Sequence, residues 1–102
     1  MEAEGPTACV RLSPAAQRDL DDVFRYSARL WGMGQAVRYV QAIRDACVHW
    51  ASTPTSAQDC RHIREGYRRG LVGRHWVYFR GEVKGIAVVR ILHQRMDAAR
   101  HL

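Results

Sequence analysis

Two histidines in the second half of the chain are the side chains best suited to proton transfer. Imidazole changes charge near neutral pH, so His75 and His93 could serve as base and acid in cleavage of RNA through its 2′-hydroxyl. That reaction also needs cations around the phosphate, and four arginines could supply them: Arg69, Arg74, Arg90 and Arg95. If the chain is a ribonuclease, its catalytic residues are His75, His93 and Arg90. A histidine at a strand end is more often a hydrogen-bonded structural residue.

The sequence contains no pattern for a metal or a cofactor. The five histidines have no HxH or HExxH spacing, and no glycine loop has the form that cradles a phosphate. The three cysteines, Cys9, Cys47 and Cys60, include no CxxC pair, which argues against a disulfide framework and a zinc knuckle. We therefore expect no cofactor and no metal, reduced thiols, and Cys47 in the core.

Positive charge is concentrated in the second half of the chain. Residues 1–52 hold six arginines against six acidic residues, whereas residues 53–102 hold nine arginines and Lys84 against four acidic residues. The net charge of +6 therefore predicts an acidic partner, either nucleic acid or an acidic protein segment. Direct DNA binding is not expected, because both predicted helices balance acids against bases and neither resembles a recognition helix.

The first half of the chain predicts a short strand followed by two helices. A weakly alternating segment, residues 8–12, leads into Ser13-Pro14, a helix-start signal. Gly32-Met33-Gly34 separates two apolar stripes at helical spacing, and Ser52-Thr53-Pro54 ends the second. The stripes predict an antiparallel hairpin with a buried face formed by Leu20, Val23, Phe24, Ser27 and Trp31 on one helix and Ala36, Val40, Ile43, Cys47 and Trp50 on the other.

The second half changes to the two-residue period of strands. Residues 67–71, 75–80 and 86–92 are separated by short glycine-bearing turns and predict a three-stranded antiparallel meander, with residues 53–58 as a turn-rich connection. Helices grouped early and strands grouped late predict an α+β fold, one small sheet with the helices on one face. We expect residues 8–102 to form a single domain and residues 1–7 to be a flexible leader.

Alternation within the last predicted strand divides its residues between two faces. One face holds Ala87, Val89, Ile91 and His93, and the other holds Ile86, Val88, Arg90 and Leu92. The first set is the more apolar and is assigned to the helix side, which places His93 at the core margin and turns Arg90 toward the open face. The strand before it carries aromatic residues on both faces, so its buried face is not assigned.

Several short motifs, taken in order, resemble those of ParE-type toxins of type II toxin–antitoxin systems, within the RelE/ParE superfamily. The resemblance runs from about residue 10 to the end of the chain. It is carried by Leu12-Ser13-Pro14, Trp31-Gly32, Gly66-Tyr67-Arg68-Arg69, Gly73-Arg74-His75 and the closing segment 88–102. It implies a small α+β toxin that binds DNA gyrase without hydrolysis and is neutralised by a ParD-type antitoxin.

Candidate binding residues follow from that resemblance. For the gyrase-facing surface we select Arg90, Arg95, Met96 and Asp97. The alternatives remain open: Asp97 could cap the chain end or pair with Arg100, and Met96 and Leu102 could pin the tail to the core. For an acidic, amphipathic antitoxin segment that orders on binding, we select Arg69, Arg74, Arg80 and Arg90.

Two other functions remain open at this level. A RelE-like, ribosome-dependent mRNA interferase would use the histidines and arginines. Such sites usually carry lysines and arginines together with a tyrosine or histidine near the C-terminus, whereas this chain has one lysine and no tyrosine after Tyr78. A degenerate relative that binds antitoxin without toxicity is the third possibility. No apolar run approaches the ~20 residues of a membrane helix, and residues 1–7 lack the features of a secretory signal, so we expect a cytoplasmic protein.

Overall fold

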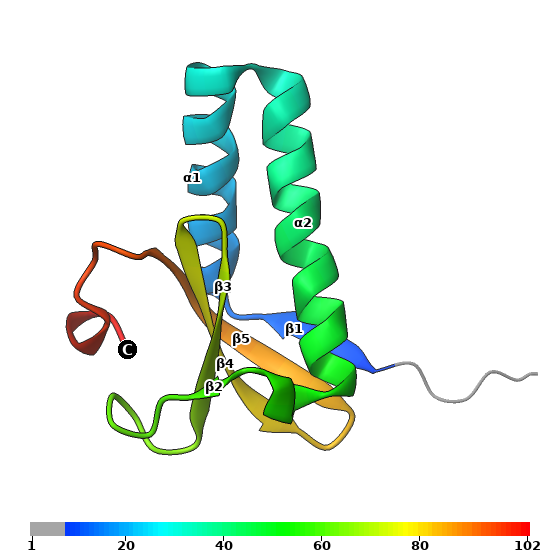
Figure 1. The fold of residues 1–102 in the computed structure, drawn as a ribbon, viewed down its shortest axis with the longest axis vertical. Coiled ribbons are helices and arrows are strands. Elements are labelled where there is room, and N and C mark those ends of the chain that lie inside the picture. The colour runs from blue at the N-terminus through cyan, green and yellow to red at the C-terminus, as the bar shows by residue number, and fades with distance from the viewer. Residues whose placement is uncertain (1–7) are drawn as a thin grey trace, which may run out of the picture.

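The computed structural model describes residues 8–102, and it confirms the α+β class (Figure 1). Strand β1 (Cys9–Leu12) is followed by helices α1 (Pro14–Trp31) and α2 (Met33–Ser52). Four strands complete the sheet: β2 (Gln58–Asp59), β3 (Tyr67–Val72), β4 (His75–Glu82) and β5 (Gly85–His93). The strand order is β1-β5-β4-β3-β2, with β1 parallel to β5 and the other neighbours antiparallel.

The helical hairpin forms where the sequence predicts it. Ser13 caps α1, because its Oγ accepts a hydrogen bond from the Ala16 amide at 2.9 Å, and Pro14 occupies the first helical position. Gly32 closes the helix with a φ of 91°, a conformation that favours glycine, and starts α2 directly. The buried side chains Leu20, Ile43 and Cys47 then pack against the sheet.

The outer end of the hairpin corrects one prediction. Trp50 is 8% exposed and stacks on Phe79, as expected of a core residue, but Trp31 is 59% exposed. A helix of 18 residues is about 27 Å long, and the far turns of both helices extend beyond the edge of the sheet (Figure 1). The helical stripe of α1 therefore continues past the surface that could bury it, and the assignment of Trp31 to the core was wrong.

The predicted meander is present, and the sheet contains one strand more than predicted. Two-residue turns at Gly73-Arg74 and Val83-Lys84 join β3, β4 and β5, which run one or two residues longer than the predicted strands. In the predicted connection, a short 3₁₀-helix (Pro54–Ser56) precedes β2, which pairs Gln58 with Arg69 and Asp59 with Arg68. A two-residue strand carries no periodic signal, so sequence could not reveal it.

A β-bulge in β5 overturns part of the predicted face assignment. Tyr78 pairs with Arg90 but Phe79 pairs with Val88, so Val89 is an extra residue on β5. Ile86 and Val88 therefore pack in the core under the helices, where Ala87 and Val89 were predicted. Ile91 and His93, beyond the bulge, lie on the helix side as predicted. An extra residue shifts the alternation of the residues before it relative to those after it, so only one part of the strand departs from the prediction.

The second face of the sheet is covered and is not the open face predicted. Tyr78 and Leu92 are 2% and 1% exposed on this face, in a cluster with Cys60 and Ala98. The cover comes from the loop between β2 and β3 and from the C-terminal tail (residues 94–102), whose Leu102 packs on the cluster. The sheet therefore supports two cores, one on each face.

Candidate functional site

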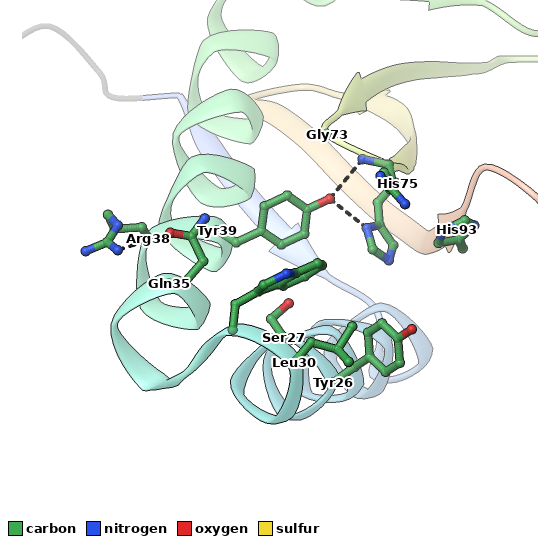
Figure 2. A pocket seen from close by; sticks show the side chains of 11 residues that line it. Tyr26, Ser27, Leu30, Gln35, Arg38, Tyr39, Gly73, His75 and His93 are labelled. Atoms are coloured by element: carbon green, nitrogen blue, oxygen red, sulfur yellow. Dashed lines mark hydrogen bonds between the residues drawn. The ribbon is translucent and has the colours of Figure 1, made fainter.

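A groove opens where the hairpin extends beyond the sheet, and we call it the hairpin groove (Figure 2). Its volume is about 510 Å³, and its walls come from the facing turns of α1 and α2 and from the β3–β4 turn. Its lining residues are Tyr26, Ser27, Leu30, Trp31, Gln35, Arg38, Tyr39, Gly73, Arg74, His75 and His93. Tyr26, Leu30 and Trp31 are each more than half exposed, and so is Met33 beside them. A contiguous exposed apolar surface of this kind indicates a binding site.

The floor of the groove is held by a hydrogen-bond network around Tyr39 (Figure 2). The Tyr39 hydroxyl lies 2.9 Å from the Val72 carbonyl, 2.7 Å from His75 Nδ1 and 3.0 Å from the Arg74 amide. A hydroxyl has one proton, so all three contacts are satisfied when it donates to the Val72 carbonyl and accepts from two N–H groups. These are the Arg74 amide and the Nδ1–H of a neutral His75 ring. The β3–β4 turn is thereby fixed to α2.

His75 and His93 lie side by side on β4 and β5. Their ring centroids are 5.3 Å apart in an edge-to-face arrangement, and His93 Nδ1 accepts a hydrogen bond from the Arg95 amide at 3.1 Å. Burial lowers the pKa of His75 to about 4, with a further lowering from His93 and an opposing effect of Asp19. The structure thus brings together the two histidines of the ribonuclease alternative, but His75 is a poor proton carrier at neutral pH.

Two of the four arginines of that alternative lie away from the histidines, whereas Arg74 lines the hairpin groove with them and Arg95 follows His93 in the tail. Arg69 lies across the Trp76 ring at 4.1 Å, on the opposite face of the sheet. Arg90 is on the predicted face, yet its side chain is only 23% exposed and pairs with Asp19 of α1 at 2.7 Å. Sequence reasoning missed Asp19, because Asp21 and Asp22 lie beside it on the same helix and no spacing distinguishes it from them.

Three of the four gyrase candidates, Arg95, Met96 and Asp97, lie in the C-terminal tail. Arg95 is exposed and Met96 is 42% exposed, so both are accessible to a partner. The Asp97 side chain accepts a hydrogen bond from the Ala99 amide at 3.1 Å and caps a short 3₁₀-helix (Ala98–Arg100). Of the alternatives left open, Asp97 is therefore a cap, and Leu102 rather than Met96 pins the tail.

The four arginines selected for antitoxin binding do not converge on one surface. Arg74 lies at the hairpin groove, whereas Arg69 is held by Gln58 and Tyr78 on the far face. Arg80 is exposed near Glu82 at 3.7 Å, and Arg90 is paired at the sheet edge. The apolar wall of the groove was missed as a binding surface, because helical spacing assigned Trp31 to the core and gave Tyr26 and Leu30 no role.

Within residues 8–102, no three histidine, cysteine or acidic side chains come together as metal ligands. In the same part of the chain, neither helix has the length and apolar character to cross a bilayer.

Comparison with known proteins gives consistent matches over most of the chain. Residues 10–98 match the family described as the ParE toxin of the type II toxin–antitoxin system parDE. Toxin ParE1 of Caulobacter vibrioides is 39% identical over 92 residues, which cover 90% of this chain and 95% of that protein. Toxin ParE1 of Mycobacterium tuberculosis is 40% identical over 92 residues, covering 89% and 94%.

A solved structure shares the fold. A chain of the chromosomal ParDE toxin–antitoxin system from P. aeruginosa superposes with a TM-score of 0.73 at 20% identity, over 87% of this chain and 98% of that one. The two-helix hairpin on a small mixed sheet is thus an architecture that other proteins also adopt.

Proposed function

We propose that this chain, which belongs to the ParE toxin family of type II toxin–antitoxin systems, inhibits DNA gyrase by binding it in the cytoplasm and is neutralised by a ParD-type antitoxin. The observation that carries the proposal is the presence of two accessible surfaces that adjoin at His75 and His93. One is the hairpin groove, and the other is the exposed part of the tail around Arg95 and Met96.

The hairpin groove suits the antitoxin. Its apolar wall of Tyr26, Leu30 and Trp31 would receive the apolar face of an amphipathic helix. Arg38 and Arg74 lie among the lining residues, where acidic side chains of the same segment could pair with them. Of the four arginines selected from sequence, this arrangement retains Arg74 as the leading antitoxin contact.

The tail suits a binding inhibitor rather than a hydrolase. Arg95 and Met96 are residue types enriched at the centres of protein interfaces, and they are displayed on a segment anchored by Asp97 and Leu102. Toxicity would then arise from occupying a surface of gyrase and not from breaking a bond. We therefore assign no catalytic residue.

The histidine pair keeps a second function worth testing, cleavage of mRNA on the ribosome. His75 and His93 are adjacent, which is the one geometric requirement for acid–base catalysis that the structure meets. If the pair is catalytic, His93→Asn abolishes toxicity. We expect His93→Asn to retain toxicity, because the asparagine oxygen can still accept the hydrogen bond from the Arg95 amide, provided that thermal unfolding shows the variant to be folded.

A side-by-side assay separates the two functions. Purified protein is added to a gyrase supercoiling and cleavage reaction and, separately, to ribosomes translating a defined mRNA. We expect inhibition of gyrase with no cleavage of the message, and recovery of supercoiling when the cognate antitoxin is added in excess. Cleavage of the message without an effect on gyrase would overturn the proposal.

A further inference from the structure

Strand β5 changes its neighbour at the edge of the sheet halfway along its length. Strand β1 pairs with β5 only as far as Leu12 and Val88, directly before the bulge. Beyond that point α1 takes over: Ser13 Oγ donates to the Val89 carbonyl at 2.8 Å, and Asp19 accepts a hydrogen bond from the Ile91 amide at 2.9 Å. The start of the helix thus satisfies backbone groups that a longer strand would have paired.

Asp19 forms more than an edge contact. Its two carboxylate oxygens also accept from Arg90 Nε at 2.7 Å and from Arg90 Nη2 at 3.0 Å, a bidentate pair. The Asp19 and Arg90 side chains are 14% and 23% exposed, so water screens the pair less than it screens the ion pairs on the surface. The hydrogen bond from Arg90 to Asp19 raises the pKa of the guanidinium above its ordinary value. Arg90 is therefore positively charged, and its guanidinium is held in a bidentate geometry by Asp19.

The third nitrogen of Arg90 reaches the tail. Arg90 Nη1 donates to the carbonyl of His101 at 3.3 Å, next to Leu102, which packs on the second core. Every nitrogen of the guanidinium therefore has a partner within the chain: Nε and Nη2 on α1, and Nη1 on the tail. One side chain connects the helix, the bulge and the last turn of the chain.

We infer that Asp19 and Arg90 are positioning residues, a clasp that holds the tail in the conformation in which Arg95 and Met96 meet their target. Arg90 then acts through the tail rather than as a direct contact to gyrase, which revises its selection from sequence. The functional half of this inference rests on the proposed inhibition of gyrase. The structural half, that the clasp orders residues 94–102, is independent of it.

Two substitutions separate a clasp from a direct contact. Asp19→Asn preserves size and an acceptor for the Ile91 amide but removes the charge that holds Arg90, and Arg90→Lys preserves the positive charge but removes the bidentate geometry. If Arg90 contacts gyrase directly, Asp19→Asn has no effect and Arg90→Lys is tolerated. If the pair is a clasp, both variants are impaired. Asp21→Asn is the matched control, because Asp21 is exposed on the same helix and accepts a hydrogen bond from the Gln17 side chain.

The experiment measures the full-length chain in three ways. Gyrase supercoiling is titrated with each variant, binding to the cognate antitoxin is measured by calorimetry, and amide hydrogen exchange is followed at Ile91 and at residues 100–102. For Asp19→Asn and for Arg90→Lys we expect roughly tenfold faster exchange at these amides and a roughly tenfold or greater rise in the half-inhibitory concentration. Antitoxin affinity should stay within about twofold, because neither Asp19 nor Arg90 lines the hairpin groove.

The outcomes separate the clasp from the proposed function. Unchanged tail exchange in both variants, or full inhibition by a variant whose tail exchanges fast, overturns the clasp. If the wild-type chain does not inhibit gyrase, the proposed function fails, and the exchange measurement alone decides whether the clasp orders the tail. Should Asp19→Asn fail to fold, Arg90→Lys carries the same test against wild type and Asp21→Asn.

Discussion

His75 and His93 face each other across β4 and β5, with ring centroids 5.3 Å apart, at the junction of the two surfaces proposed to bind partners. His75 is tied to the hairpin groove through Tyr39, and His93 is tied to the tail through the Arg95 amide. Both Nδ1 atoms are thus engaged by the fold. The pair connects the groove to the tail, which is a structural role that two strand-end histidines can fill without catalysis.

The low pKa of His75 predicts a pH dependence of stability. Its folded-state pKa of about 4 lies below the unfolded value of 6.5, so between these values the unfolded chain binds a proton that the folded chain does not. Stability should therefore fall as pH drops from about 6.5 toward 4, with a slope of at most about 1.4 kcal/mol per pH unit from this group. Urea unfolding at pH 5.0 to 6.5 measures this slope.

The control for this prediction compares two histidine substitutions. His75→Asn should flatten the slope, whereas His62→Asn should leave it unchanged, because His62 is exposed in the loop before β3. Equal slopes for wild type and His75→Asn would show that His75 does not titrate in this window.

The two helical tryptophans should behave in opposite ways. Trp50→Ala removes a ring stacked on Phe79 and should cost about 3–5 kcal/mol of unfolding free energy. Trp31→Ala should change that free energy by less than about 0.5 kcal/mol, because the ring is 59% exposed. The same Trp31 variant should weaken binding of the cognate antitoxin by about 2 kcal/mol or more, which calorimetry measures. Tight antitoxin binding by Trp31→Ala would exclude the groove wall as a main contact.

Gly70 is required by close packing between β3 and α2. A Cβ atom at this position would lie 1.8 Å from Cζ2 of Trp50, a ring that is itself held against Phe79. Gly70→Ala should therefore destabilise the fold by at least about 2 kcal/mol in urea unfolding. Gly81→Ala is the matched control on β4, since a Cβ there meets nothing within 4 Å. Equal stability of the two variants would contradict this packing.

The cysteines should differ in reactivity toward a thiol reagent. Burial raises the pKa of Cys47 to about 11 and raises the pKa of Cys60, whereas Cys9 is exposed on β1. Because the thiolate is the reactive form, Cys47 and Cys60 should be modified only on unfolding, whereas the exposed Cys9 should be modified in the native chain. Mass spectrometry of the labelled chain identifies the modified residues, and rapid labelling of native Cys47 would contradict its burial.

Local signals in the sequence predicted most of the secondary structure. Ser13-Pro14, the glycines around Met33 and the glycine turns between strands each act within a few residues, so hairpin and meander could be located. The exposure of Trp31 depends instead on where the sheet ends relative to the helices, and that is a tertiary property. The hairpin groove was missed for this reason.

The bulge at Val89 limited the prediction of the candidate site. Strict alternation predicts the faces of a strand correctly only while each residue faces one residue of the neighbouring strand. Nothing in an apolar run such as Ile86 to Val89 marks where an extra residue is inserted. The position of Arg90 on the second face was predicted, but its partner was not. Asp19 is 71 residues away in sequence, and only the fold reveals that pairing.

Gyrase supercoiling titrated with the wild-type chain and with an Arg95→Ala/Met96→Ala variant tests whether the tail inhibits gyrase by binding it. We predict that the wild-type chain inhibits supercoiling and that the variant needs roughly thirtyfold more protein for the same effect, the equivalent of about 2 kcal/mol lost at an interface centre. Its antitoxin affinity and thermal unfolding should match those of the wild type. The absence of inhibition by the wild-type chain, or equal inhibition by the variant, would contradict inhibition of gyrase through the tail.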